Sequence, residues 1–122
     1  MDIEDFVAFS SRECLAPRDG AAPQECLEAF LDDLLEMLVR GGCKVVGHIK
    51  GMMTCGKDKP LFFSITSIEN NLRFQGGPLG ESDSFILTMN VIVSGIDENK
   101  LEETFSAALG RHFVIRLKPD YS

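Results

Sequence analysis

The chain has 122 residues, of which 44% are hydrophobic and 25% are charged, and its formal net charge is −7. This length suits one compact domain over residues 1–122 and is short for two. The negative charge argues against a nucleic-acid partner, because binding to a phosphate backbone requires clustered lysine and arginine.

The N-terminal stretch MDIEDFVAFSSREC is acidic where a secretory signal is basic, and no apolar run reaches the roughly 18 residues of a membrane span. We therefore expect a soluble, cytoplasmic protein without a membrane partner. The cysteines form no CxxC pair and lie in apolar patterns, which is typical of reduced, buried thiols. They are Cys14, Cys26, Cys43 and Cys55.

Residues 1–22 are predicted to form an N-terminal arm and a loop. The apolar side chains of residues 1–14, with Phe6 and Phe9 among them, fit either a short helix or an arm that docks on the domain. Proline and glycine mark residues 15–24 as a loop that ends at a helix start. The predicted core of the domain is therefore an α-β-β-β-β-α unit over residues 23–118.

A helix is predicted from Glu25 to Arg40. Its apolar residues recur at helical spacing and its acidic residues occupy the opposite face, while Gly41 and Gly42 supply a stop. The apolar stripe consists of Leu27, Phe30, Leu31, Leu34, Leu35 and Leu38.

The stretch from Cys43 to Cys55 predicts a long strand in which Gly47 and Gly51 mark a bend or bulge. Strict alternation along the strand separates a dry face from a mixed one. It places Cys43, Val45, Gly47, Ile49, Gly51, Met53 and Cys55 on the dry face, and Lys44, Val46, His48, Lys50, Met52 and Thr54 on the mixed face.

Three further strands are predicted at residues 61–68, 72–76 and 84–95. Asp97 is suited to cap a second helix over residues 98–113, and residues 114–118 either extend that helix or add an edge strand. The sequence thus predicts an α+β two-layer sandwich. Its sheet is an antiparallel meander of four strands, or five with the edge strand, and both helices cover one face.

The chemical candidates do not combine into a catalytic or metal site. His48 has no orienting carboxylate in its own strand, so an exposed or partner-contacting histidine is the better interpretation. His112 at a helix C-terminus is favoured there by the helix dipole alone. Cys43, Cys55 and the two histidines match no zinc spacing, and the glycines of residues 76–82 lack a P-loop pattern. We therefore predict no enzyme activity, no metal and no cofactor.

The runs VVGHIKGMM, LFFSITSI, LRFQG and FILTMNVIVSGID, followed by an amphipathic helix, resemble the small C-terminal domain of some CobW-type GTPases of anaerobes and methanogens. The likeness spans roughly residues 25–113. The chain has no P-loop, no Mg²⁺-binding acidic strand motif and no CxCC segment. The resemblance therefore implies the accessory domain alone, with a role near metal or corrinoid handling and no nucleotide hydrolysis in this chain.

The face of the sheet that the helices cannot reach carries more apolar residues than a solvated surface does. The N-terminal arm is too short to cover it, so we predict a second copy packed sheet to sheet or a partner protein, which makes the chain an interaction module. The alternative is a small-ligand or metal-binding protein that uses the face around His48 and Lys50. Alternation places Val46, Ser64, Thr66, Ile68, Gln75 and Thr88 on this face, together with the predicted contact residues His48, Lys50, Met52, Phe62, Arg73, Ile86, Asn90 and Ile92.

Overall fold

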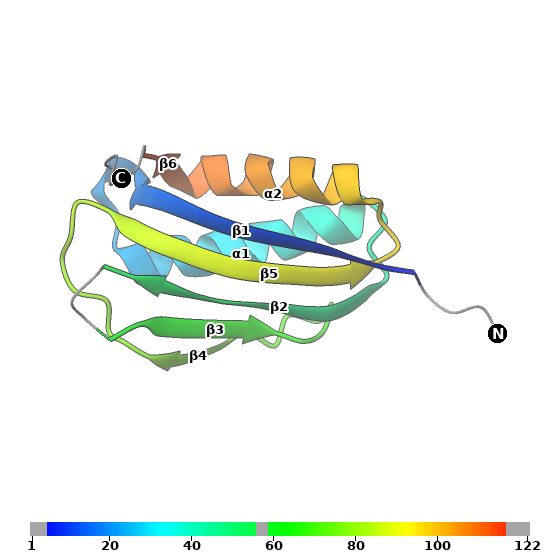
Figure 1. The fold of residues 1–122 in the computed structure, drawn as a ribbon, viewed down its shortest axis with the longest axis horizontal. Helices are drawn as coiled ribbons and strands as arrows, with labels where there is room; N and C mark the ends of the chain where they lie inside the picture. Colours follow the sequence, from blue (N-terminus) through cyan, green and yellow to red (C-terminus); the bar gives the residue numbers. More distant parts are fainter. Residues whose placement is uncertain (1–4, 56–58, 117–122) are drawn as a thin grey trace, which may run out of the picture.

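The computed structural model describes residues 5–55 and 59–116. It is an α+β structure in which two helices pack on one side of a six-stranded antiparallel sheet (Figure 1), which confirms the predicted class and adds strands to the predicted sheet. The elements in chain order are β1 (Phe6–Pro17), the 3₁₀ turn η1 (Arg18–Gly20), α1 (Pro23–Arg40), β2 (Val45–Thr54), β3 (Leu61–Ile65), β4 (Arg73–Gly76), β5 (Phe85–Ser94), α2 (Glu98–His112) and β6 (Phe113–Ile115).

Strand β1 occupies the segment that we expected to be an arm or a short helix, and that expectation was wrong. It pairs antiparallel with β5 from Phe6 opposite Ser94 to Leu15 opposite Phe85. The physical reason is that β5 would otherwise leave one row of backbone groups unpaired near the core. On the helix side, the ring of Phe9 packs against Phe105 of α2 with centroids 4.8 Å apart.

The strand order is β4-β3-β2-β5-β1-β6, so the sheet is not the predicted simple meander. Strand β5 pairs with β2 and β1, and not with β4, which precedes it in the chain. Strands β2 and β5 have ten residues each, whereas β4 has four. Pairing β5 with β2 therefore satisfies many more backbone groups than pairing it with β4 would.

A bulge at Gly47 confirms one of the two predicted irregularities in β2. The register shifts between Val46, which lies opposite Val93, and His48, which lies opposite Ile92. This extra residue changes the phase of the alternation. The assignment of Val46 to the mixed face was therefore wrong, because its side chain is in the core with 5% of its surface exposed.

Gly51 marks a close contact and not a bulge, since the pairing of β2 with β3 and β5 continues through it. A Cβ atom at this position would lie 2.2 Å from the backbone oxygen of Thr88 and 2.7 Å from the Phe63 ring. The sheet therefore requires glycine here for space.

The two helices match the prediction closely. The apolar stripe of α1 is buried along its whole length, and Asp97 caps α2 by accepting a 2.7 Å hydrogen bond from the Lys100 N–H. The Phe30 and Phe105 rings meet edge to face between the helices, with centroids 5.7 Å apart. Residues 113–115 form the edge strand β6, which was one of the two predicted alternatives for the tail.

Candidate functional site

The side of the sheet opposite the helices, called here the open face, is uncovered in the described structure (Figure 1). Residues opposite each other on paired antiparallel strands point to the same face, so the register of the strands defines its members. These are Ala8, Ser10, Arg12 and Cys14 of β1; His48, Lys50, Met52 and Thr54 of β2; Phe62 and Ser64 of β3; Arg73 and Gln75 of β4; and Ile86, Thr88, Asn90 and Ile92 of β5.

A polar row crosses the middle of the open face from one strand to the next. Ser64 lies opposite Arg73 on one side and Lys50 on the other, and Lys50 in turn lies opposite Asn90. The row ends at Ser10 of β1, whose hydroxyl donates a hydrogen bond to the Asn90 side chain. Lys50 is therefore flanked on both neighbouring strands by short polar side chains, which leave its ammonium group accessible.

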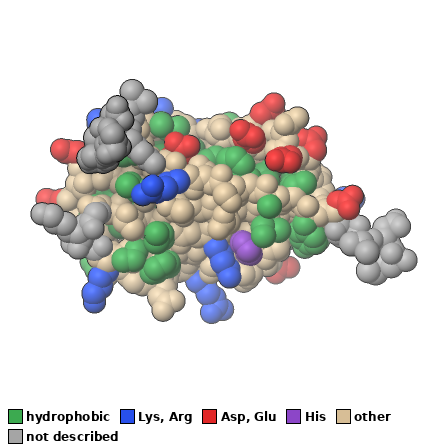
Figure 2. Space-filling view, viewed as in Figure 1, with side chains coloured by type: hydrophobic (Ala, Val, Ile, Leu, Met, Phe, Trp, Pro, Cys, Tyr) green, Lys and Arg blue, Asp and Glu red, His purple; other side chains and the backbone are tan. Residues whose placement is uncertain are grey.

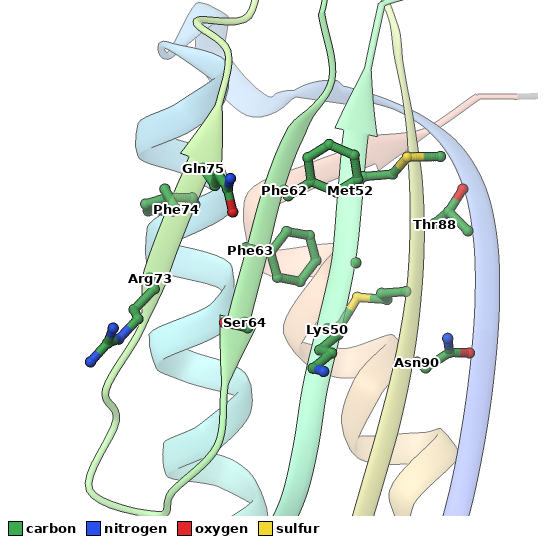
Figure 3. A pocket seen from close by; sticks show the side chains of 12 residues that line it. Lys50, Met52, Phe62, Phe63, Ser64, Arg73, Phe74, Gln75, Thr88 and Asn90 are labelled. Carbon is green, nitrogen blue, oxygen red and sulfur yellow. The ribbon is translucent and has the colours of Figure 1, made fainter.

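An apolar pair lies next to this row. Phe62 and Met52 are directly opposite each other on β3 and β2. Figure 3 shows their side chains side by side, with Gln75 pointing toward them and the Arg73 side chain extending away from β4. The Phe62 side chain is large and hydrophobic, yet 47% of its surface is exposed.

The pair and the polar row together line a shallow hollow of about 650 Å³. Its walls combine an exposed aromatic ring, a thioether, an ammonium group and several side-chain amide and hydroxyl groups. Such a mixture can hold an apolar group and orient it by hydrogen bonds. The residues that line it are Lys50, Gly51, Met52, Phe62, Phe63, Ser64, Arg73, Phe74, Gln75, Thr88, Met89 and Asn90 (Figure 3).

The charges on the open face all have one sign. Arg12, Lys50 and Arg73 are exposed, and within residues 5–55 and 59–116 none of them forms an ion pair or a side-chain hydrogen bond. No described outward position of the strands holds aspartate or glutamate. Acidic residues instead line the outer surfaces of α1 and α2. The acidic side chains that are visible in Figure 2 lie mainly toward the upper rim of the face.

The apolar surface of the open face is smaller than predicted. Val46 is buried in the core, and Ile68 lies beyond the end of β3 at Ile65. A second apolar area lies at the other end of the face, where the side chains of Phe6 and Ile92 both lie close to Gly47. Two apolar areas therefore lie on either side of the polar row.

All of the predicted contact residues lie on the open face. Sequence reasoning did not include Ser10 and Arg12, because β1 was not recognised as a strand. The row of β1 that faces the helices carries Ser11 and Glu13 between Phe9 and Leu15, so the alternation that signals a half-buried strand is interrupted there.

The cysteines and His112 lie away from the hollow. Burial raises the pKa of the Cys26 and Cys43 thiols above the ordinary value, which favours the neutral form over the metal-binding thiolate. His112 was predicted to be favoured by the helix dipole alone, but its Nε2 also lies 2.5 Å from an Asp33 carboxylate oxygen and so joins the end of α2 to α1. Among the described residues, no three His, Cys, Asp or Glu side chains gather into a group that could hold a metal ion.

Comparisons with known proteins add no assignment: no protein-family model, no curated protein and no solved structure matches the chain. The resemblance to the CobW C-terminal domain therefore stays a prediction. In the part of the chain that the structure describes, no helix combines the length and apolar character that crossing a bilayer requires.

Proposed function

We propose that this chain is a non-catalytic interaction module that binds a partner through its open face. The observation that carries the proposal is the half-exposed Phe62 ring, which lies with Met52 beside the uncovered polar row centred on Lys50. A large aromatic side chain held in place by a rigid sheet supplies contact energy at low entropic cost, and the neighbouring polar groups supply specificity.

The division of the sheet into two sides supports this function. Both helices pack on one side, where the core residues of β2, β3 and β5 are almost fully buried. The fold therefore does not depend on covering the open face. A surface of this kind is free to bind a partner without any change in the core.

Photo-cross-linking from position 62 tests the proposal. A photoreactive phenylalanine analogue would replace Phe62 in the protein expressed in its own cells, and cross-linked adducts would be separated by mass. The matched control places the same analogue at Val39 on α1, whose side chain is 42% exposed and so similarly accessible. We expect adducts from position 62 and few from position 39.

The mass of the adduct also distinguishes a second copy from a different protein. Equal adduct formation at both positions, or none at position 62, would contradict the proposal. If the predicted relationship to CobW-type proteins holds, the adduct from position 62 contains a GTPase of that type or a component of a corrinoid-dependent methyltransferase system.

A second function is favoured by the hollow itself, whose volume of about 650 Å³ lies within the range of small-molecule sites. In this alternative the open face around His48 and Lys50 holds a small ligand or a metal ion. Metal analysis and an ultraviolet-visible spectrum of the purified protein test it. A stoichiometric metal or a bound chromophore would favour this second function over the first.

A further inference from the structure

Lys50 lies at the centre of the open face. Strands β2 and β5 are the middle strands of the sheet, and Lys50 pairs with Asn90 across them. Arg73 on β4 and Arg12 on β1 lie on either side of this centre. With strands about 4.8 Å apart, Arg73 is about 10 Å from Lys50 across the sheet. Any partner that covers the hollow also covers Lys50.

A second copy packed sheet to sheet does not fit this arrangement. In a two-fold dimer the same surface patch meets itself, so the central lysines of both copies would lie near each other inside the interface. Arg12 and Arg73 would add further positive charge from each copy. A buried charge without an opposite partner costs several kcal/mol, as an order of magnitude. This argues against the predicted homodimer through the open face.

The acidic outer surface of the helices in another copy has the right charge but the wrong geometry. A contact between the open face of one copy and the helix layer of the next is heterologous, and it leaves an open face and a helix layer free at the two ends. Such a contact repeats without closing unless its rotation forms a ring. The net charge of −7 on each copy opposes such growth.

We infer that the partner is a different protein that presents an acidic segment with an apolar side chain between its carboxylates. This inference rests on the proposed function and names the chemistry of the partner. The apolar side chain packs against Phe62 and Met52 in the hollow, and a neighbouring carboxylate pairs with Lys50. Arg73 is close enough to Lys50 to pair with a second carboxylate of the same segment.

Charge also explains how the module selects this partner in the proposed complex. Lys50 has no acidic neighbour among the described residues, so a carboxylate that approaches it does not have to displace an existing ion pair. The overall negative charge of the chain repels acidic proteins at long range, but screening limits that repulsion to about 8 Å at physiological salt. Within this distance the local charge of the open face decides the interaction.

Synthetic peptides provide a direct test. The probe is a fluorescent peptide in which glutamate alternates with leucine; one comparison peptide has lysine in place of glutamate, and another has serine in place of leucine. Fluorescence anisotropy with the purified full chain measures binding. We expect the glutamate–leucine peptide to bind, the lysine peptide to bind at least about tenfold more weakly, and added salt to weaken binding.

Two variants locate the interaction. Lys50→Glu should weaken binding of the glutamate–leucine peptide by about tenfold or more and should improve binding of the lysine peptide. The control Lys100→Glu makes the same change of charge on α2, where Lys100 is exposed, and should leave both affinities unchanged. Both substituted side chains are at exposed positions, and a thermal unfolding curve confirms that each variant is folded.

The outcomes separate this inference from the proposed function. Equal binding of the acidic and basic peptides, no binding of the acidic peptide, or equal effects of Lys50→Glu and Lys100→Glu would overturn the acidic partner. Adducts from position 62 would still support the interaction module in that case. If the adduct from position 62 has the mass of two copies of this chain, the inference is wrong although the open face is an interface.

Discussion

The two sides of the sheet differ in what they contribute. On the helix side, Ile49, Met53 and Val91 have no exposed surface, and they pack with α1 and α2 into one core. On the open face, the same strands present Lys50, Met52 and Asn90, which pack against no second layer in the described structure. Alternation along a strand can therefore place the side chains that stabilise the fold on one face of a sheet and leave the side chains on the other face for binding.

The largest effect is expected in the core. Leu34→Ala in α1 should lower the free energy of unfolding by about 2–5 kcal/mol, and Leu31→Ala should do the same, because each side chain is fully buried and its loss leaves a cavity. Urea unfolding followed by circular dichroism measures the change. Near-neutral effects at both positions would show that the helix does not pack through this face.

A glycine in the sheet gives the next effect. Gly51→Ala should destabilise the fold by about 1–3 kcal/mol, because the added methyl group meets the Thr88 backbone oxygen of β5 and the buried side chains of Met89 and Phe63, which cannot move easily. Gly110→Ala in α2 is the matched control, since apart from its chain neighbours and the adjoining backbone of its own helix no described atom lies within 4 Å of the new Cβ, and it should stabilise the helix by up to about 1 kcal/mol. Equal effects in the two variants would contradict the close contact at Gly51.

The buried thiols give a smaller, pH-dependent effect. Burial raises the pKa of the Cys26 and Cys43 thiols in the folded state above their ordinary value of 9.0. The stability from these neutral thiols is therefore fully present below about pH 9 and is lost as pH rises through the folded-state pKa, because the unfolded chain releases its protons first. Urea unfolding at several alkaline pH values measures this loss. Cys43→Ala should make the fall shallower, and an identical pH profile would contradict the assignment.

The smallest effect is expected on the open face. His48→Ala should change the free energy of unfolding by no more than about 0.5 kcal/mol, because His48 makes no hydrogen bond or ion pair within residues 5–55 and 59–116 and lies outside the core. Thermal unfolding measures the change. A large fall in the midpoint would place His48 among the residues that stabilise the fold.

The sequence predicts elements whose signals are local. The leucine stripe of α1 and the Asp97 cap of α2 depend on residues within a few positions of each other, and both are present as predicted. The order of strands depends on which long strands can form backbone hydrogen bonds with each other. The pairing of β2 with β5 joins residues that are far apart in the chain. Local patterns carry no information about such a choice.

The candidate site was predictable to the same extent. Alternation placed the predicted contact residues on one face. The bulge at Gly47, however, reverses which face the residues on its N-terminal side point to, so Val46 lies in the core. Arg12 was not among the predicted open-face residues, because the sequence did not indicate that β1 is a strand. The hollow depends on side chains from four strands that pair across the sheet, so its shape could not be read from any one segment.

One measurement tests the separation of the two sides most directly. Ile92→Glu places a negative charge at an open-face position two residues from Asn90, and the experiment measures both its free energy of unfolding and the yield of adducts from the photoreactive group at position 62. Val39→Glu on α1 is the control. We expect Ile92→Glu to remain folded with nearly unchanged stability and to lose the adduct, because its carboxylate repels the acidic partner, while the control keeps the adduct. An unchanged adduct yield in Ile92→Glu, or a loss of stability large enough to explain the missing adduct, would contradict the claim that the open face binds and the helix side stabilises.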